Sequence, residues 1–175
     1  MPLCLAMVLA GGTAYADGTQ VQRGPAPNWA VQSEPMPVPA DAAGAVFMRR
    51  QDTEVHLDDK GQLLYNSYRI KILHPNALQL GNLSIGWNPA AGAPVVHVIK
   101  IYRDHEVIDV LRDASFEILR REDQLEAAGL DGNLTAVLRI PDLRVGDELE
   151  FGVTVRTSDP TLGENDAGVL ILPPE

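Results

Sequence analysis

Hydrophobic and polar side chains alternate with a period of two along much of this chain, and such alternation is typical of β-strands. The two clearest runs each keep one parity apolar, with Leu134, Ala136, Leu138 and Ile140 in the first and Leu149, Phe151, Val153 and Val155 in the second. Pro141 ends the first run because it has no N–H for a strand ladder, and Gly146-Asp147 supplies a turn before the second. The pattern predicts two strands that could pair as a hairpin.

A second hairpin is predicted earlier in the chain. Apolar and polar residues alternate over 53–58, Asp59-Lys60-Gly61 favours a turn, and the alternation returns over 64–73. Residues 95–103 are apolar on both faces, which is typical of a strand in a central position. Shorter apolar runs predict further strands at 83–87, 107–111, 116–119 and 169–172.

Helix is the minor element in this pattern. Only residues 121–128 could form about two helical turns, with Gly129 as a C-terminal stop. Short apolar runs separated by corners rich in Gly, Pro, Asn and Asp favour a sandwich over a βαβ fold. The predicted fold class is all-β and mostly antiparallel, a β-sandwich-like domain with at most one short helix.

The first forty residues differ from the rest. Residues 3–10 are apolar and are followed by Ala14-Tyr15-Ala16, which fits the core and cleavage site of a secretory signal. Prolines recur over 24–39 and favour extended backbone, with Trp29 as the single large anchor. We therefore expect a signal peptide at 1–16, a Pro-rich extended arm at 17–40 and a β-sandwich domain at 41–175.

Composition narrows the function classes. The chain has 175 residues, a formal net charge of -10 and a pI near 4.7, which argues against nucleic acid or anionic lipid as a partner. The sole cysteine, Cys4, lies inside the predicted signal, so the mature segment would contain no thiol for a disulfide, a zinc-thiolate site or a nucleophile. The apolar run at 3–10 is too short to span a bilayer. We expect an exported protein, periplasmic or extracellular, with no membrane span in this segment.

No residue spacing in the sequence indicates a catalytic or metal site. The histidines lie far apart, without a His-x-His or His-Glu-x-x-His spacing: His56, His74, His97 and His105. We therefore predict no catalytic residues, no metal and no cofactor. A paired-carboxylate hydrolase built from Glu122, Asp123 or Asp131 is a third and weaker alternative.

Two groups of residues are assigned roles by their type and setting. Trp29 and Trp87 are candidate binding aromatics, although both are more simply explained as side chains that fill a core or an edge. Turn positions are expected to need glycine or a neighbouring aspartate for backbone reasons, not for binding, and these are Gly61, Asp131, Gly132, Gly146 and Asp147.

Several short motifs occur in a recognisable order: Pro27-Asn28-Trp29, the 64–73 strand, Tyr102-Arg103-Asp104 before Ile108-Asp109-Val110, Leu119-Arg120-Arg121-Glu122, Asp131-Gly132 and Val145-Gly146-Asp147. Together they resemble the bacterial domain of unknown function found immediately before a transglutaminase-like core in exported proteins. The resemblance implies a β-sandwich without established catalysis, and a downstream domain that carries the cysteine, histidine and aspartate. His105 stands where the family usually has Gly, and the family's final strands are expected to be missing.

The function expected from the resemblance is that of a non-catalytic accessory domain. It would pack against a downstream transglutaminase-like, cysteine peptidase-like core of the same protein, or position that core's substrate. The alternative is a periplasmic module that binds cell-wall glycan or peptide. A broad apolar patch beside the C-terminal end would favour packing, and an exposed aromatic pair on a sheet face would favour binding.

Overall fold

The computed structural model describes residues 18–120 and 132–157. The predicted signal peptide, the predicted helix at 121–128, Asp131 and the apolar run at 169–172 lie outside the described residues. The elements in chain order are β1 (Gln22–Arg23), β2 (Val46–Asp58), β3 (Gly61–Ile72), the 3-10 helix η1 (Pro75–Gly81), β4 (Asn82–Trp87), β5 (Val95–Arg103), β6 (Glu106–Asp109), α1 (Val110–Asp113), β7 (Glu117–Arg120), β8 (Leu134–Arg139) and β9 (Glu148–Thr157).

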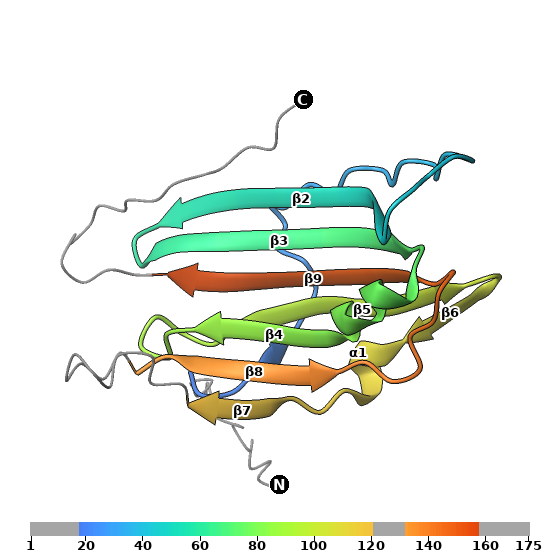
Figure 1. Ribbon diagram of the computed structural model, residues 1–175. Coiled ribbons are helices and arrows are strands. Elements are labelled where there is room, and N and C mark those ends of the chain that lie inside the picture. The colour runs from blue at the N-terminus through green and yellow to red at the C-terminus, as the bar shows by residue number, and fades with distance from the viewer. Residues whose placement is uncertain (1–17, 121–131, 158–175) are drawn as a thin grey trace, which may run out of the picture.

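The described strands form two sheets (Figure 1). The larger sheet has the order β1-β5-β9-β3-β2, with β6 also paired to β5, and the smaller has the order β4-β8-β7. Apart from the two-residue parallel pairing of β1 with β5, the strand pairs are antiparallel. The fold is therefore the mostly antiparallel, all-β sandwich-like class that the sequence pattern predicts.

The hairpin predicted around residues 59–61 is confirmed. Strands β2 and β3 pair from Asp58↔Gly61 to Val46↔Ile72, with one register shift between Met48 and Arg50. Gly61 has a φ of 112°, a conformation that side chains with a Cβ rarely adopt. Strand β2 begins at Val46, several residues before the alternating pattern becomes clear.

The predicted pairing of the last two runs is wrong. Strand β8 pairs with β4 and β7 in the small sheet, whereas β9 pairs with β3 and β5 in the large one. Their apolar rows face each other across the core and do not lie side by side. The chain changes sheets between Ile140 and Glu148, through a corner that contains Asp142 with a φ of 54° and Gly146 with a φ of 94°.

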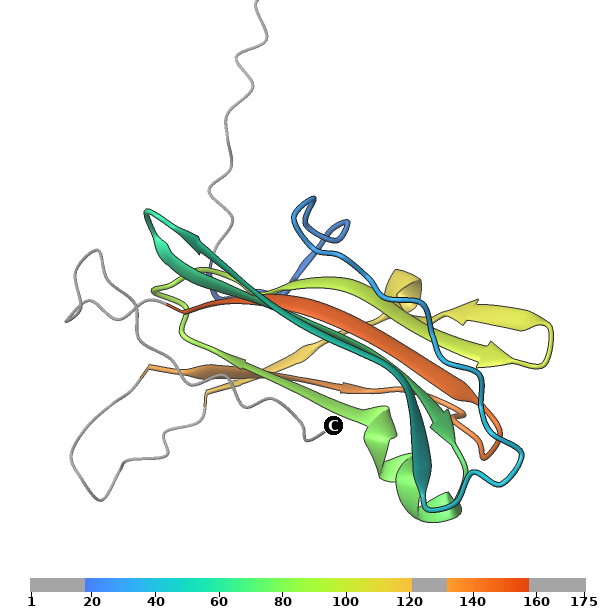
Figure 2. The same cartoon turned by 90° about the horizontal axis from the view of Figure 1, so that it is seen from above.

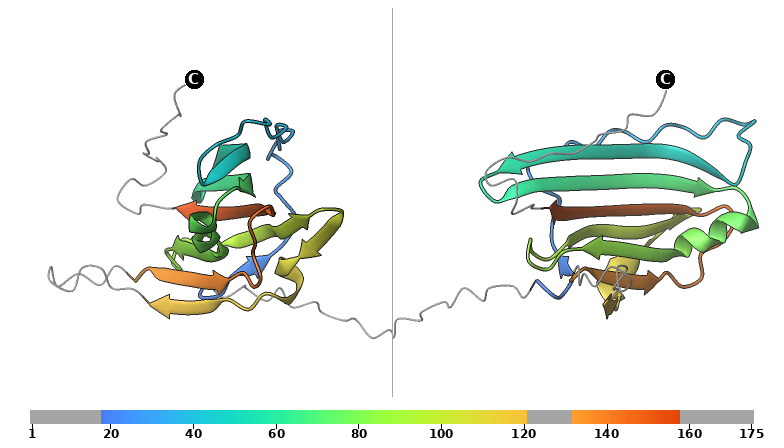
Figure 3. Two further views of the ribbon diagram at one scale, coloured as in Figure 1. Left: turned by 45° about the vertical axis from the view of Figure 1, so that its right-hand side comes forward. Right: turned by 60° about the vertical axis from the view of Figure 1, so that its left-hand side comes forward.

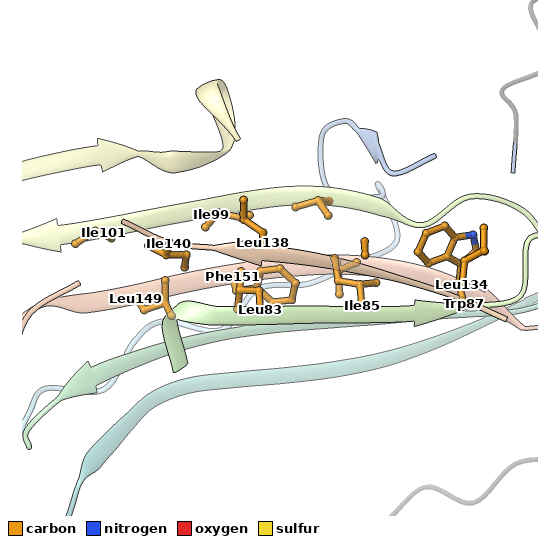
Figure 4. Packing of buried hydrophobic residues seen from close by; sticks show 13 residues of the cluster. Leu83, Ile85, Trp87, Ile99, Ile101, Leu134, Leu138, Ile140, Leu149 and Phe151 are labelled. Atoms are coloured by element: carbon orange, nitrogen blue, oxygen red, sulfur yellow. The ribbon is translucent and has the colours of Figure 1, made fainter. Parts of the chain in front are cut away.

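The core lies between the two sheets, with the small sheet facing β9 and β5 (Figure 4). The small sheet supplies the alternate residues of β4 and β8, and the large sheet supplies those of β5 and β9. Each fully buried aliphatic or aromatic side chain contributes roughly 1.5–3 kcal/mol relative to exposure. The buried cluster consists of Leu83, Ile85, Trp87, Val96, Ile99, Ile101, Leu134, Ala136, Leu138, Ile140, Leu149, Phe151 and Val153.

The large sheet is wider than the small sheet, so β2 and β3 extend beyond it (Figure 3). The register places Val55, Leu64 and Val155 in one row on the core-facing side. Val55 is 44% exposed and Leu57, two residues further along the same face, is 63% exposed. We call Val55, Leu57 and Leu64 the apolar strip. It lies beside Thr157, the last residue of β9.

Two short helical segments were not indicated by the pattern. Helix η1 begins after His74, whose ring nitrogen accepts a hydrogen bond from the Asn76 N–H, and it carries Pro75 in its first turn. The strand predicted over 107–111 ends at Asp109, because the Asp109 carboxylate caps the single turn of α1 by accepting from the Arg112 N–H.

The Pro-rich arm crosses the face of the large sheet that points away from the small sheet (Figure 2). We call this the outer face, and we call residues 24–38 the strap. The strap contains no helix or strand. At its start, Gly24 donates its N–H to the Val96 carbonyl of β5, and at its end, Met36 donates to the Arg49 carbonyl of β2. The strap therefore spans the outer face from one side of the sheet to the other.

Candidate functional site

Two β-bulges interrupt the strand register of the large sheet, and both contact the strap. One lies between Met48 and Arg50, and the other lies between Val96 and Val98. A bulge leaves one residue without a partner in the ladder and re-aims its side chain. The two extra residues are Arg49 and His97, and each binds one end of the strap.

The Arg49 bulge holds the end of the strap through both backbone and side chain. The Arg49 carbonyl accepts from the Met36 N–H at 2.7 Å, and the Arg49 Nε–H donates to the Met36 carbonyl, also at 2.7 Å. The guanidinium also contacts a Glu148 carboxylate oxygen at 2.6 Å. Arg49 therefore joins the strap to strand β9 as well as to β2.

The His97 bulge holds the start of the strap. The ring Nδ1 lies 3.0 Å from the Gly24 carbonyl oxygen, and Nε2 lies 2.7 Å from Thr154 Oγ1. A carbonyl oxygen can only accept, so Nδ1 carries a proton, and in the neutral ring Nε2 then accepts the hydrogen bond from the Thr154 hydroxyl. Partial burial lowers the pKa of His97, although the strap carbonyls of Gly24 and Pro25 act in the opposite direction.

Between the bulges, strand β2 holds the strap by side-chain carboxylates at a spacing of two residues. Glu54 Oε1 accepts from the Val31 N–H at 2.7 Å. Asp52 Oδ1 accepts from both the N–H and the hydroxyl of Ser33. Residue numbers increase along the strap while those of its partners in β2 decrease. The strap therefore runs antiparallel to β2, although it forms no backbone ladder with this strand.

Aromatic rings line the middle of the same path. Trp29 of the strap stacks on His56 of β2, with ring centroids 5.0 Å apart and planes 11° apart. The rings of Trp29 and of Tyr65 in β3 lie edge to face, with their centroids 6.3 Å apart. The Tyr65 ring also contacts the His97 ring. The fully buried Tyr65 accepts a hydrogen bond at its hydroxyl from the Gln32 amide, at 2.7 Å. Trp29 is thus half-buried against polar aromatic side chains of the outer face.

Next to the strap lies a group of paired charges, which we call the ionic cluster: Arg49, Arg50, Asp52, Arg69, Glu148 and Glu150. Its centre is Arg50, which is buried and binds Glu150 at 2.8 Å and Asp52 at 3.2 Å. Arg50 also donates to the Ser67 hydroxyl at 3.0 Å. One guanidinium therefore lies between two carboxylates and compensates their charge. The Arg50–Asp52 pair is an ion pair only, because Arg50 Nε and Asp52 Oδ2 are buried without a hydrogen-bond partner.

The second half of the ionic cluster surrounds Glu148. Burial opposes ionisation of this carboxyl, but hydrogen bonds from Arg49 and Arg69 outweigh it and lower the pKa of Glu148. The Arg69 guanidinium also lies over the Tyr102 ring, 3.7 Å from its centroid. Burial, together with the hydrogen bond that its hydroxyl donates to Glu150, raises the pKa of Tyr102 to about 12.

A separate group fixes the corner where the chain passes from β8 to β9. Arg103 binds both carboxylate oxygens of Asp147 at 2.8 Å, and Asp147 also accepts from the Arg144 N–H. Burial opposes ionisation of Asp147, but these donors lower its pKa below the usual range. Arg103 reaches Asp142 as well. Asp147 thus anchors the corner beside Gly146.

The structure separates the two candidate binding aromatics. Trp87 is only 4% exposed, and its indole N–H donates to the Gly18 carbonyl, so it is a core side chain and cannot offer a ring to a ligand. Trp29 lies in the strap and stacks on His56. The turn glycines Gly61, Gly132 and Gly146 all have positive φ values.

The histidines do not converge on a metal. Within residues 18–120 and 132–157, no three His, Cys, Asp or Glu side chains lie close enough together to hold an ion. In the same residues, no helix is both long and apolar enough to cross a membrane.

Sequence reasoning missed the ionic cluster and His97. The available signal was the polar parity of β9, where Glu148 and Glu150 alternate with the apolar Leu149 and Phe151. That alternation indicates a solvated face. The alternation does not reveal that arginines of β2 and β3 pair with these glutamates, because the period of a strand carries no information about which strands lie beside it.

Comparisons with known proteins support this architecture. The model of DUF3857, described as a domain of unknown function with a solved structure, matches residues 58–168. The chain is also similar to a protein of Parabacteroides distasonis ATCC 8503 described as a candidate protease, with a TM-score of 0.53 and 15% identity. That alignment covers 65% of this chain and 23% of the other, so this chain spans about a quarter of that protein's length. No curated protein matches the chain. Because the family model covers more than half of the sequence, the chain belongs to DUF3857, the domain-of-unknown-function family.

Proposed function

We propose that this chain is a non-catalytic accessory domain of an exported, transglutaminase-like protein. In this role the β-sandwich packs against a downstream catalytic core, or positions the substrate of that core. The membership of a domain family and the likeness to one part of a larger candidate protease support the proposal. Position before a transglutaminase-like core stays a prediction from the resemblance.

The observation that carries the packing role is the apolar strip. Val55 and Leu57 are exposed on the core-facing side of β2, where the small sheet does not reach. The register joins Leu57 through Gln62 to Thr157, so the strip lies where the chain leaves β9. A downstream domain that follows β9 is therefore tethered close to this surface, which raises its effective concentration there.

The test expresses the full-length gene product and the same protein with Val55→Lys and Leu57→Lys. If the strip packs against the core, the double variant will lose turnover of a labelled peptide by about tenfold or more, or will raise KM. The matched control is Val107→Lys, an equally exposed valine on β6 at the opposite end of the sheet. Equal activity in all three proteins would reject the strip as the packing surface.

The same proteins separate the alternatives. Hydrolysis of the peptide by residues 18–157 alone would replace the accessory role with an independent hydrolase. Retention of the isolated domain on purified cell-wall glycan, with no effect of the strip variants on the full-length protein, would favour the glycan-binding module. Reading the gene past Glu175 gives a further check, because the proposal requires a downstream cysteine, histidine and aspartate.

A further inference from the structure

The contacts between the strap and the sheet resemble those of a bound peptide and differ from those of a strand in a ladder. Within the described residues, its backbone bonds to the sheet lie at its two ends, at Gly24 and Met36. Between these ends the contacts come from sheet side chains, namely Asp52, Glu54 and Tyr65. A segment clamped at its ends and recognised by side chains in the middle can leave without disrupting a ladder.

The surface beneath the strap is polar, which lowers the cost of uncovering it. The groups that lose a strap partner are the Tyr65 hydroxyl and the carboxylates of Asp52 and Glu54, and water can hydrogen-bond to each of them once the strap leaves. Two of the larger aliphatic side chains of the strap contribute little burial, since Val31 is 75% exposed and Met36 is 55% exposed, and Trp29 is only half-buried. Releasing a segment that covers a hydrophobic surface would cost more free energy, because apolar area would be exposed to water.

We propose that the outer face of β2 and β3, between the Arg49 and His97 bulges, is a binding groove for a peptide that turns at an aromatic residue and is extended beyond it, and that the strap occupies this groove in cis. The inference does not depend on the accessory role, because it concerns the opposite face of the large sheet from the apolar strip.

The groove's chemistry defines the ligand class. Asp52 and Glu54 accept amide N–H groups of alternate residues, which requires extended backbone. The His56 ring receives an aromatic side chain, and the Tyr65 hydroxyl receives a side-chain amide three positions later. The carboxylates disfavour acidic residues at the central positions. In the strap, Asn28 and Trp29 form a turn in which Ala30 donates its N–H to the Pro27 carbonyl. The ligand is therefore a proline-flanked peptide that turns at an aromatic residue, is extended beyond the turn and carries Gln three positions later.

The experiment uses a variant in which residues 27–36 are replaced by a Gly/Ser linker of equal length, so that β1 and the connection to β2 remain. The probe is a fluorescein-labelled peptide with the sequence of residues 25–38, measured by fluorescence anisotropy. The linker variant should bind it saturably. The parent chain should bind it at least tenfold more weakly, because the tethered strap competes at an effective concentration on the order of millimolar.

Matched controls identify the contacts. A peptide with Trp29→Ala and Gln32→Ala should bind the linker variant at least tenfold more weakly, and Tyr65→Phe in the receptor should weaken binding of the unmodified peptide severalfold. Arg112→Ala, an exposed residue away from the groove, should leave binding unchanged. Circular dichroism establishes that each receptor is folded. If the linker variant does not fold, the full chain carrying Trp29→Ala and Gln32→Ala replaces it.

Two outcomes would overturn the inference. One is the absence of saturable binding to a folded receptor whose strap has been weakened or replaced. The other is equal binding by the parent and the linker variant, which would mean that the peptide binds somewhere other than beneath the strap. Neither outcome bears on the accessory role, because the apolar strip and the activity of the full-length protein are measured separately.

Discussion

At the scale of single residues, Arg50 supplies the positive charge that compensates two carboxylates on the outer face. It is buried and pairs with Glu150 and Asp52 together. We expect Arg50→Met to lower the free energy of unfolding by about 3–5 kcal/mol, because it leaves two buried carboxylates without their cation. Glu150→Gln should lower the free energy of unfolding by less, since Arg50 still forms its ion pair with Asp52. Urea denaturation measures both.

The control for this comparison is Arg112→Ala, which breaks an exposed ion pair with Asp113. Exposed pairs contribute about 0–1 kcal/mol, so this variant should unfold close to the parent. A cost of Arg50→Met no larger than that of Arg112→Ala would show that the ionic cluster does not hold the outer face.

Gly152 is a residue-scale constraint of a different kind. A Cβ at this position would lie 3.0 Å from Cγ1 of Val98 and 3.7 Å from Oγ of Ser67, in the buried centre of the large sheet. Gly152→Ala should therefore destabilise the protein by about 1–3 kcal/mol through overpacking. Gly86→Ala is the control, because nothing lies within 4 Å of that Cβ. Thermal melts in which both variants match the parent would contradict the packing argument.

At the scale of elements, the hairpin of β2 and β3 could be predicted because all of its determinants are local. Alternation sets the faces, and Asp59-Lys60-Gly61 sets the turn. The partners of β8 and β9 could not be predicted in this way. An apolar parity states that Leu138 and Phe151 face a core, but a hairpin and two facing sheets satisfy that parity equally well. The corner between β8 and β9 determines which of the two arrangements forms. This corner depends on Arg103, which is distant in sequence.

That corner gives a prediction at the element scale. Gly146 has a φ of 94°, which is strained for a β-branched residue, so Gly146→Val should lower the free energy of unfolding by about 1–3 kcal/mol. Gly86→Val, on an exposed strand position with open space, should cost much less. Denaturant midpoints of the two variants test this difference, and equal midpoints would remove the backbone argument.

The strap and its bulges illustrate a second limit of sequence reasoning. Prolines over 24–39 predict extended backbone, and the strap contains no helix or strand and has a turn at Asn28 and Trp29, but composition does not say which surface the strap covers. The bulges at Arg49 and His97 carry no sequence signal, since neither is a glycine. The groove around Trp29 was therefore predictable only as a single anchoring aromatic without a known partner.

At the scale of the whole molecule, acid should destabilise the fold. The pKa values of Asp147 and Glu148 are lowered by their arginine partners, so both carboxyls bind protons more readily in the unfolded chain. Their stabilising contribution is present above the unfolded pKa of about 4 and is lost as the pH falls through the folded values. Unfolding free energy measured from pH 7 down to pH 3 should decrease. Glu148→Gln should make that decrease shallower, and an unchanged slope would contradict the assignment.

The overall class, an antiparallel sandwich, followed from the number and spacing of short apolar runs. The unequal widths of the two sheets did not. Val55 and Leu57 have the pattern of core residues, yet they are exposed because no strand of the smaller sheet lies over them. Exposure of this kind depends on how many strands each layer receives, which is a property of the assembled topology.

The strap also has a consequence for the order in which this protein assembles. Residues 24–38 are synthesised first, but their surroundings include His97 and Thr154, and Thr154 lies in the last strand described. The local hairpin of β2 and β3 can form early, whereas the floor of the groove is complete only after β9 has inserted between β3 and β5. The strap therefore emerges before the surface that it covers, and until that surface is complete the strap remains accessible to proteases.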